Sequence, residues 1–187
     1  LINLIKYMLE NITWLGQSAF KIITSSRQVI YIDPWKIPGD SSPADYILIT
    51  HDHYDHFSPE DITKIRKEKT KIFCPHVCMK KIGGQVKTVK PGEEIKEKDL
   101  TIRTVPSYNI NKDYHPRENN WVGYVIEVDG QKIYHAGDTD LIPEMSDLEN
   151  IDIAMLPVSG TYVMDSQEAG RAVEKINPKK VIPMHYG

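Results

Sequence analysis

One stretch of the chain decides the fold, and it reads Tyr46-Ile47-Leu48-Ile49-Thr50-His51-Asp52-His53-Tyr54-Asp55-His56. Its first half is apolar and contains β-branched residues, which predicts a buried strand over residues 46–50. The second half has the pattern H-x-H-x-D-H and is expected to form the loop at the C-terminal end of that strand. Residues i and i+2 of an extended segment point the same way, so His51 and His53 can converge on one point. Asp55 and His56 follow closely and can hold a second point.

This loop predicts a metal site. Imidazoles together with carboxylates are the ligands that zinc-like cations take in proteins. The alternative is a polar loop that happens to be rich in histidine, but a buried strand leading into a charged cluster needs a counter-ion or a metal. Asp52 and Tyr54 are the residues of the loop that we do not expect to be ligands.

Length and composition predict a single globular domain over residues 1–187. Hydrophobic residues make up 40% of the chain, and the net charge of −3 argues against a nucleic-acid-binding surface. No apolar run approaches the roughly 20 residues of a membrane span, so no membrane is expected. Cys74 and Cys78 make no disulfide framework, which favours the cytoplasm. Met8 fits a natural start, which leaves residues 1–7 as either upstream sequence or sequence that is not native.

Before and after the histidine-rich loop, the sequence predicts a hairpin and a helix. The hairpin, over residues 20–32, ends in Asp33. A carboxylate there can hydrogen-bond a metal ligand or the loop backbone, or it can simply cap the turn before Pro34. Ser58 is the expected N-cap of the helix, with Pro59 at its first position.

The next two motifs leave alternatives open. Cys74-x-His76-x-Cys78 lacks a second pair of ligands, so we interpret it as two buried thiols and a helix-start histidine rather than a structural metal site. A long irregular stretch over residues 106–117 is rich in polar side chains. Such a loop inside a compact domain is often functional.

The second half of the chain repeats the pattern of apolar runs that end in polar residues. These runs predict strands over residues 121–128, 132–134, 151–158 and 181–184. The first two are expected to form a hairpin joined by Asp129-Gly130. Asp138 follows the second of these strands and His185 the last. Asp165 and Glu168 are expected to cap a helix that ends at Asn177. Its inner face is expected to carry Ala169, Ala172, Val173 and Ile176.

The motifs together resemble the metallo-β-lactamase-fold hydrolases. The resemblance rests on H-x-H-x-D-H, on Gly137-Asp138-Thr139 and on Pro183-Met184-His185 in that order, with Asp33 where the family has an early aspartate. It implies an α/β fold, a four-layer αββα sandwich with the metals at one edge between two β-sheets. The short chain and its segment Tyr31-Ile32-Asp33-Pro34-Trp35 look like the compact metal-dependent hydrolases akin to ascorbate-phosphate lactonase.

The resemblance also implies a ligand set for two divalent ions. One ion would take His51, His53 and a third ligand from residues 107–115. The other would take Asp55, His56 and His185, and Asp138 would bridge both ions. A metal-bridging hydroxide would then attack an ester, lactone or phosphodiester. Zinc is favoured over manganese or iron.

The third ligand of the first ion is an open question. The family has a histidine shortly after the strand that ends here at Pro106, whereas this chain has Ser107-Tyr108-Asn109. Asn is a poor ligand for zinc. His115 is the only histidine of the loop, and Pro116 restricts it to an extended conformation. We expect His115 to be a direct ligand or an active-site acid; the alternative is completion of the site by Asn109 or water.

Several roles around the site stay alternatives. His135 is interpreted as a residue that touches a ligand, if it reaches the site at all. A small-molecule substrate is expected, and an anionic one is weakly favoured by four residues of the later loops: Tyr108, Lys112, Arg117 and Tyr162. The competing functions are a di-iron redox protein, which typically has Glu in place of His53, and a non-catalytic metal-binding module. Because His185 lies so close to the end, the natural chain is expected to continue past Gly187.

Overall fold

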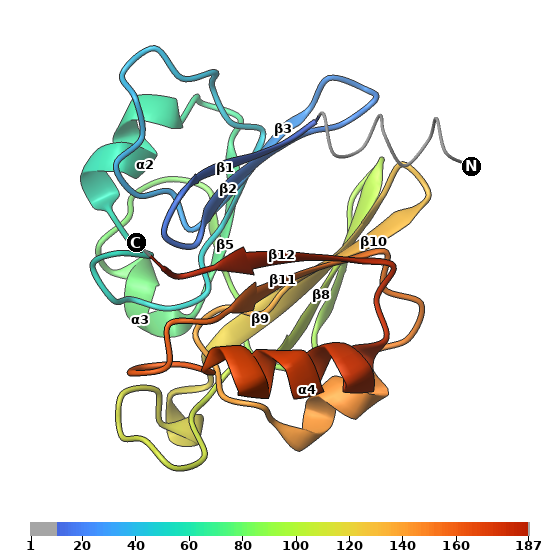
Figure 1. Cartoon of the computed structure of the whole chain (residues 1–187). Coiled ribbons are helices and arrows are strands. Elements are labelled where there is room, and N and C mark those ends of the chain that lie inside the picture. The colour runs from blue at the N-terminus through green and yellow to red at the C-terminus, as the bar shows by residue number, and fades with distance from the viewer. Residues whose placement is uncertain (1–10, 187) are drawn as a thin grey trace. The chain divides into compact units, whose positions relative to one another are not determined.

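The computed structural model describes residues 11–186, which form two compact units, one ending at Thr88 and the other beginning at Val89. Each unit contains one mixed six-stranded sheet whose strands lie side by side in chain order (Figure 1). The single domain expected from the length stays a prediction. Met8 and Gly187, on which the expectations about the chain ends rest, lie outside the described residues.

The first sheet brings two polar strand ends to one edge. Its strands are β1 (Ile12–Gly16), β2 (Ala19–Ile23), β3 (Val29–Ile32), β4 (Tyr46–Leu48), β5 (Lys71–Cys74) and β6 (Val86–Thr88). The pairs β1–β2 and β2–β3 are antiparallel, which confirms the predicted hairpin, whereas β3 to β6 are parallel. Parallel neighbours have their carboxyl ends at the same edge, so Asp33 after β3 meets the loop that follows β4.

Strand β4 ends at Leu48, two residues earlier than the sequence predicts. The N–H of Ile49 still donates to the carbonyl oxygen of Phe73 in β5, at 2.9 Å. The N–H of Thr50, however, donates to the Asp33 carboxylate at 2.8 Å. A side chain thus replaces the neighbouring strand as the partner of this N–H, and the strand stops where the site begins.

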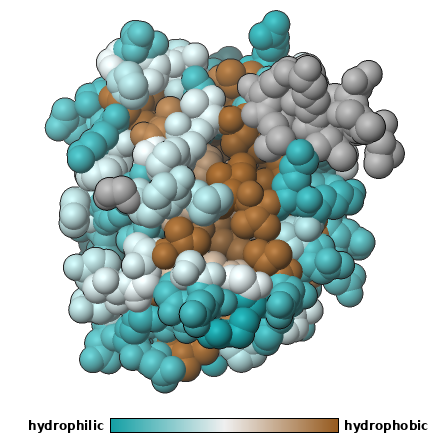
Figure 2. Space-filling model, in the orientation of Figure 1, coloured by the Kyte–Doolittle hydropathy of each residue, from teal (hydrophilic) through white to brown (hydrophobic). Residues whose placement is uncertain are grey.

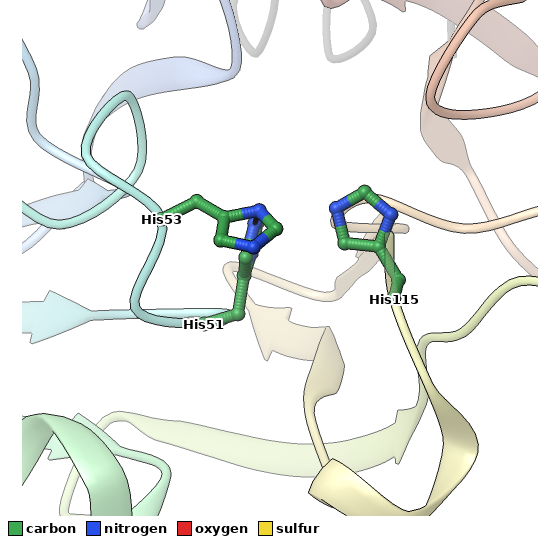
Figure 3. A group of neighbouring side chains, drawn as sticks. All are labelled: His51, His53 and His115. Carbon is green, nitrogen blue, oxygen red and sulfur yellow. Dashed lines mark hydrogen bonds between the residues drawn. The ribbon is translucent and has the colours of Figure 1, made fainter. Parts of the chain in front are cut away.

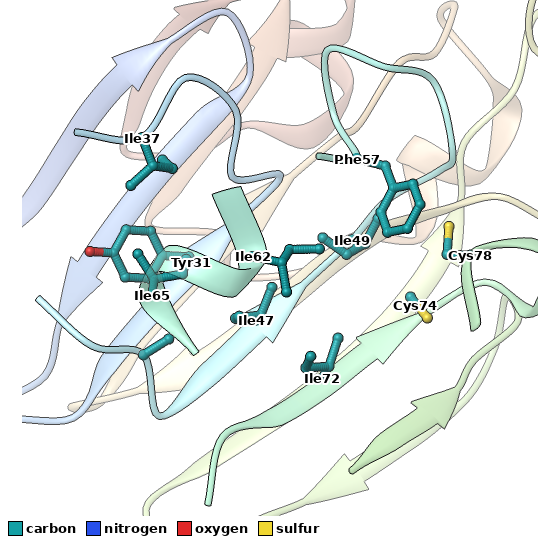
Figure 4. Packing of buried hydrophobic residues seen from close by; sticks show 11 residues of the cluster. Tyr31, Ile37, Ile47, Ile49, Phe57, Ile62, Ile65, Ile72, Cys74 and Cys78 are labelled. Carbon is teal, nitrogen blue, oxygen red and sulfur yellow. The ribbon is translucent and has the colours of Figure 1, made fainter. Parts of the chain in front are cut away.

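Helix α2 (Pro59–Ile65) packs against one face of the first sheet. It begins as predicted, with Ser58 Oγ accepting the N–H of Asp61 and Pro59 in the first turn. Its buried residues Ile62 and Ile65 pack into the core of the first unit (Figure 4). The other members of that cluster are Tyr31, Ile37, Ala44, Ile47, Ile49, Phe57, Ile72, Cys74 and Cys78, the last from helix α3 (His76–Met79). Burying an isoleucine side chain contributes about 1.5–3 kcal/mol, so this packing fixes β4 firmly.

The second sheet also gathers polar strand ends. Its strands are β7 (Glu94–Lys96), β8 (Leu100–Pro106), β9 (Val122–Val128), β10 (Gln131–His135), β11 (Ile153–Pro157) and β12 (Lys180–Met184). Strands β7 to β10 alternate in direction, which confirms the predicted β9–β10 hairpin, and β10 to β12 are parallel. Strand β8 therefore runs in the direction of β10. The segments that follow β8, β10, β11 and β12 start from one edge.

Helix α4 (Ser166–Ile176) covers the second unit with an amphipathic face. Asp165 and Glu168 form the predicted capping box, and Asn177 ends the helix in a left-handed conformation. Ala169, Ala172 and Ile176 are buried, whereas Val173, also expected to face inward, is half-buried. The outer face of α4 is hydrophilic (Figure 2).

Short 3-10 turns complete the second unit: η1 (Arg117–Asn119) and η2 (Pro143–Asp147). No helix within residues 11–186 is long and apolar enough to cross a membrane.

Candidate metal centre

Two imidazoles of the loop after β4 converge as predicted. Nε2 of His51 lies 3.1 Å from Nδ1 of His53, and the two rings lie edge to face with centroids 4.6 Å apart (Figure 3). In a tetrahedral zinc site with Zn–N distances of about 2.0–2.1 Å, two ligand nitrogens are about 3.4 Å apart. The two nitrogens therefore have nearly the separation that one zinc-like cation requires.

Asp33 organises this loop from inside the first unit. Its carboxylate is fully buried and accepts three hydrogen bonds: from Thr50 N (2.8 Å), Thr50 Oγ1 (2.6 Å) and His56 Nδ1 (2.7 Å). The predicted contact of Asp33 with the loop is thus present, both to its backbone and to a candidate ligand. Asp33 adopts a left-handed backbone, with φ of 47°, that Asp tolerates better than most residues.

These contacts assign the tautomers of two histidines. Because a carboxylate only accepts, His56 must carry its proton on Nδ1. The hydroxyl of Thr50 donates to Asp33, so it acts as an acceptor toward His51 Nδ1, 2.9 Å away. Both rings then carry a lone pair on Nε2, the form in which imidazole binds a metal. Asp33, His51 and His56 also lie close enough to hold an ion themselves, but the two donors on Asp33 Oδ2 favour positioning over ligation.

Asp55 is held by a residue that the sequence pattern did not indicate. Its Oδ2 accepts a hydrogen bond from Gln17 Nε2 at 2.8 Å and lies 3.8 Å from His56 Nε2. Gln17 follows β1 in a turn, with φ of 49°. The two residues are 38 positions apart, so no local pattern connects them.

In the second unit, the structure brings two predicted ligands, His115 and His185, to a third, the carboxylate of Asp138. Asp138 Oδ2 lies 2.9 Å from His185 Nε2 and 3.3 Å from His115 Nε2. All three side chains are buried, each at most 6% exposed. Both imidazole nitrogens thus face the same carboxylate oxygen of Asp138.

The other nitrogens of these rings also have partners. His185 Nδ1 lies 3.0 Å from Ser159 Oγ, and His115 Nδ1 lies 3.0 Å from Asn109 Oδ1. In four of the five candidate histidines Nδ1 contacts a residue that is not a proposed ligand, whereas Nδ1 of His53 faces Nε2 of His51. Such partners are typical of metal-binding histidines. The donor set, neutral imidazoles and carboxylates, therefore fits a zinc-like cation.

Other residues named from the sequence lie elsewhere. Asp52 lies 3.7 Å from Lys81, and Tyr54 is 77% exposed. His76 is exposed at the start of α3, and Cys74 and Cys78 are buried free thiols, as interpreted. His135 is buried at the end of β10.

The ring of His135 takes part in the turn that carries Asp138. Its Nδ1 accepts the N–H of Gly137 at 3.2 Å. This places the His135 ring beside the backbone of the turn that carries Asp138.

Comparisons with known proteins extend over nearly the whole chain. A family model described as "Beta-lactamase superfamily domain" matches residues 11–185. A UPF0173 metal-dependent hydrolase of Thermococcus onnurineus is 37% identical over 195 residues, covering 94% of this chain and 84% of that protein. A crystal structure from Parabacteroides distasonis has 37% identity and a TM-score of 0.87, covering 94% of this chain and 82% of the other. Igni18, a novel metallo hydrolase from Ignicoccus hospitalis, has 29% identity and a TM-score of 0.78, with the same coverage.

Proposed function

The chain belongs to the UPF0173 metal-dependent hydrolase family of the metallo-β-lactamase superfamily, and on this premise we propose that it is a dinuclear hydrolase of ester, lactone or phosphodiester bonds. Family membership confirms the predicted metallo-β-lactamase fold, an α/β fold with two mixed six-stranded sheets. It also confirms the prediction of a metal-dependent hydrolase. The proposal adds the number of ions and the kind of bond that is cleaved.

The observation that carries the proposal is the position of Asp138. Its carboxylate reaches Nε2 of His115 and Nε2 of His185, at 3.3 and 2.9 Å. The family's ligand order assigns His185 to the second ion, and we assign His115 to the first. Two cations about 3.5–4 Å apart repel each other, and a shared carboxylate relieves that repulsion.

The proposed ligand sets follow the same family order. The first ion is assigned to three histidines, His51, His53 and His115. The second is assigned to Asp55, His56 and His185, and Asp138 is shared. When bound, such a pair of ions supplies a hydroxide nucleophile near neutral pH and stabilises the developing oxyanion. Imidazole and carboxylate donors favour zinc, with manganese and iron as the other candidates.

The chain's own residues prepare this chemistry by fixing the ligands. Asp33 orients His51 and His56 as described above, and Gln17 orients the carboxylate of Asp55. Should the first ion be completed by Asn109 or water, His115 would serve as the acid that protonates a leaving group. The contacts of Asn109 with the chain favour ligation by His115.

The substrate class is less constrained than the reaction. Lys112 forms an ion pair with Asp140 at 2.5 Å, and both Arg117 and the Tyr108 hydroxyl contact Glu144, at 2.8 and 2.9 Å. These groups therefore lend no support to the expectation of an anionic substrate. The resemblance of residues 31–35 to ascorbate-phosphate lactonase makes a lactone the first substrate class to test.

Metal analysis with a hydrolysis screen tests the proposal. Protein stripped of metal and reloaded with zinc is expected to hold two ions per chain and to cleave a lactone, a thioester or a phosphodiester. Asp138→Ala should lower the occupancy of both ions together, because the shared ligand is lost. Asp52→Asn, whose carboxylate lies near Lys81, is the matched control and should keep both. One ion per wild-type chain would contradict the proposal, and bound iron with a redox-active absorption band would favour a di-iron protein.

A further inference from the structure

We propose that Asn109 is a positioning residue that holds the His115 ring in the tautomer with its proton on Nδ1. The tautomer follows from hydrogen bonds within the second unit. Its use, presenting Nε2 to a metal ion, rests on the function proposed above. Asn109 thus takes a role different from the one that the sequence left open for it, which was to complete the site as a ligand.

The first step is the orientation of the Asn109 amide. Its NH2 group donates to Asp140 Oδ1 and to the backbone carbonyl oxygen of Tyr162, both at 3.0 Å. Both partners only accept, so the nitrogen of the amide must face them. The amide oxygen is then fixed on the opposite side. Asn109 is only 7% exposed, which protects this arrangement from water.

The second step concerns the two groups of His115 that face the amide oxygen. Asn109 Oδ1 accepts the backbone N–H of His115 and faces its ring Nδ1, each at 3.0 Å. An amide oxygen cannot donate, so Nδ1 must carry the proton. In the neutral ring Nε2 then has the lone pair, and this is the nitrogen that faces Asp138.

The third step is the closure of the loop. The backbone N–H of Asn109 donates to the carbonyl oxygen of His115 at 2.8 Å, so the two residues are joined by three hydrogen bonds. Residues 110–114 form the excursion between them. This closure brings a histidine back to the strand end after β8, where the family has its ligand and this chain has Asn.

The fourth step is the support behind Asn109. Asp140 is 3% exposed and also accepts the N–H of Ile110 (2.8 Å) and Lys112 Nζ (2.5 Å). Its carboxylate is therefore held in place by two donors besides Asn109. A fixed carboxylate explains why a neutral amide can impose one tautomer on the ring.

The tautomer is tested by nuclear magnetic resonance. Long-range ¹H–¹⁵N spectra distinguish the two ring nitrogens of His115, recorded on metal-free protein at pH about 9, where an ordinary imidazole is neutral. Wild type should show the proton on Nδ1. Asn109→Ala should lose this preference, because no acceptor then faces Nδ1–H. Asn111→Ala, an exposed Asn of the same loop, is the control.

Metal titration separates this proposal from the proposed function. Asn109→Ala should weaken the binding of one zinc ion by about 10–100-fold, with Asn111→Ala close to wild type. If folded Asn109→Ala keeps the wild-type tautomer, Asn109 does not position the ring. If the tautomer is lost but zinc affinity is unchanged, the positioning role stands and the assignment of His115 as a ligand fails. Should Asn109→Ala not fold, the wild-type spectrum decides, since a proton on Nε2 of His115 in place of Nδ1 would contradict the proposal.

Discussion

Asp33→Asn should disable two metal ligands without changing the shape of the core. Asn has the volume of Asp and tolerates the left-handed backbone at this position. If the oxygen of the new side-chain amide still accepts the N–H of Thr50, the NH2 group takes the place of Oδ2. It then donates to Thr50 Oγ1 and to His56 Nδ1. His56 must then move its proton to Nε2. The Thr50 hydroxyl, no longer donating to residue 33, turns toward His51 Nδ1 and forces the same change there.

The size of the effect follows from the contacts at Oδ2. Hydrogen bonds to a charged group contribute about 1.5–3 kcal/mol and neutral ones about 0.5–1.5 kcal/mol. The two hydrogen bonds at Oδ2 change from charged to neutral, which lowers the free energy of unfolding by about 2 kcal/mol. At this chain length, the melting temperature should then fall by about 4–8 °C. Disturbing the partner of a ligating histidine weakens metal binding by about 10–100-fold, and here two rings are affected.

The assay compares zinc affinity, measured by competition with a chromophoric chelator, with thermal unfolding of the metal-free protein. Asp61→Asn is the matched control, since Asp61 is also a buried carboxylate of the first unit. Its oxygens accept hydrogen bonds from Lys64 Nζ and from the N–H groups of Lys36 and Ile37. Both variants should lose stability, but only Asp33→Asn should lose zinc affinity, by at least about 100-fold. Equal zinc affinities in the two variants would refute the tautomer argument.

Two further predictions concern carboxylates of the first unit. Asp55→Asn should lose most of the hydrolytic activity while Asp52→Asn keeps it, and equal losses would mean that the wrong carboxylate of the loop was assigned. For Asp61, burial raises the pKa of the carboxyl group, but hydrogen bonds from the Lys64 and Ser58 side chains and from two backbone N–H groups outweigh it and leave the pKa below its ordinary value. A pKa lowered in the folded state contributes stability above the unfolded value of about 3.9 and loses it as the pH falls. The stability gap between wild type and Asp61→Asn should therefore be full at pH 7 and shrink below about pH 5, and a gap independent of pH would contradict this.

The sequence predicts those parts of the site that lie next to their own structural signal. The apolar run of β4 places the histidine loop at a strand end, and the N-cap at Ser58 starts α2 immediately after it. Asp33 could be singled out because it ends the neighbouring strand β3. Where strands are parallel, adjacency in the sheet then brings these strand ends together.

The remaining contacts join residues that no local pattern connects. Gln17 reaches Asp55 across 38 positions, and Thr50 was expected to be an ordinary strand residue rather than a link between Asp33 and His51. Asn109 was weighed only as a ligand, because its sequence position matches the family's histidine. Its actual partners depend on how residues 110–114 fold back, which turn chemistry does not specify.

The two units solve the same chemical problem by a similar arrangement. Thr50 and Asn109 are neutral groups that would each allow more than one hydrogen-bond pattern with a histidine. A buried aspartate behind each removes that freedom, Asp33 by accepting from the Thr50 hydroxyl and Asp140 by accepting from the Asn109 amide. The neutral residue thus becomes a fixed acceptor without placing another negative charge against the ligand ring. In this arrangement the charge that orients His51 and His115 stays one residue away from their rings, whereas Asp33 contacts the ring of His56 directly.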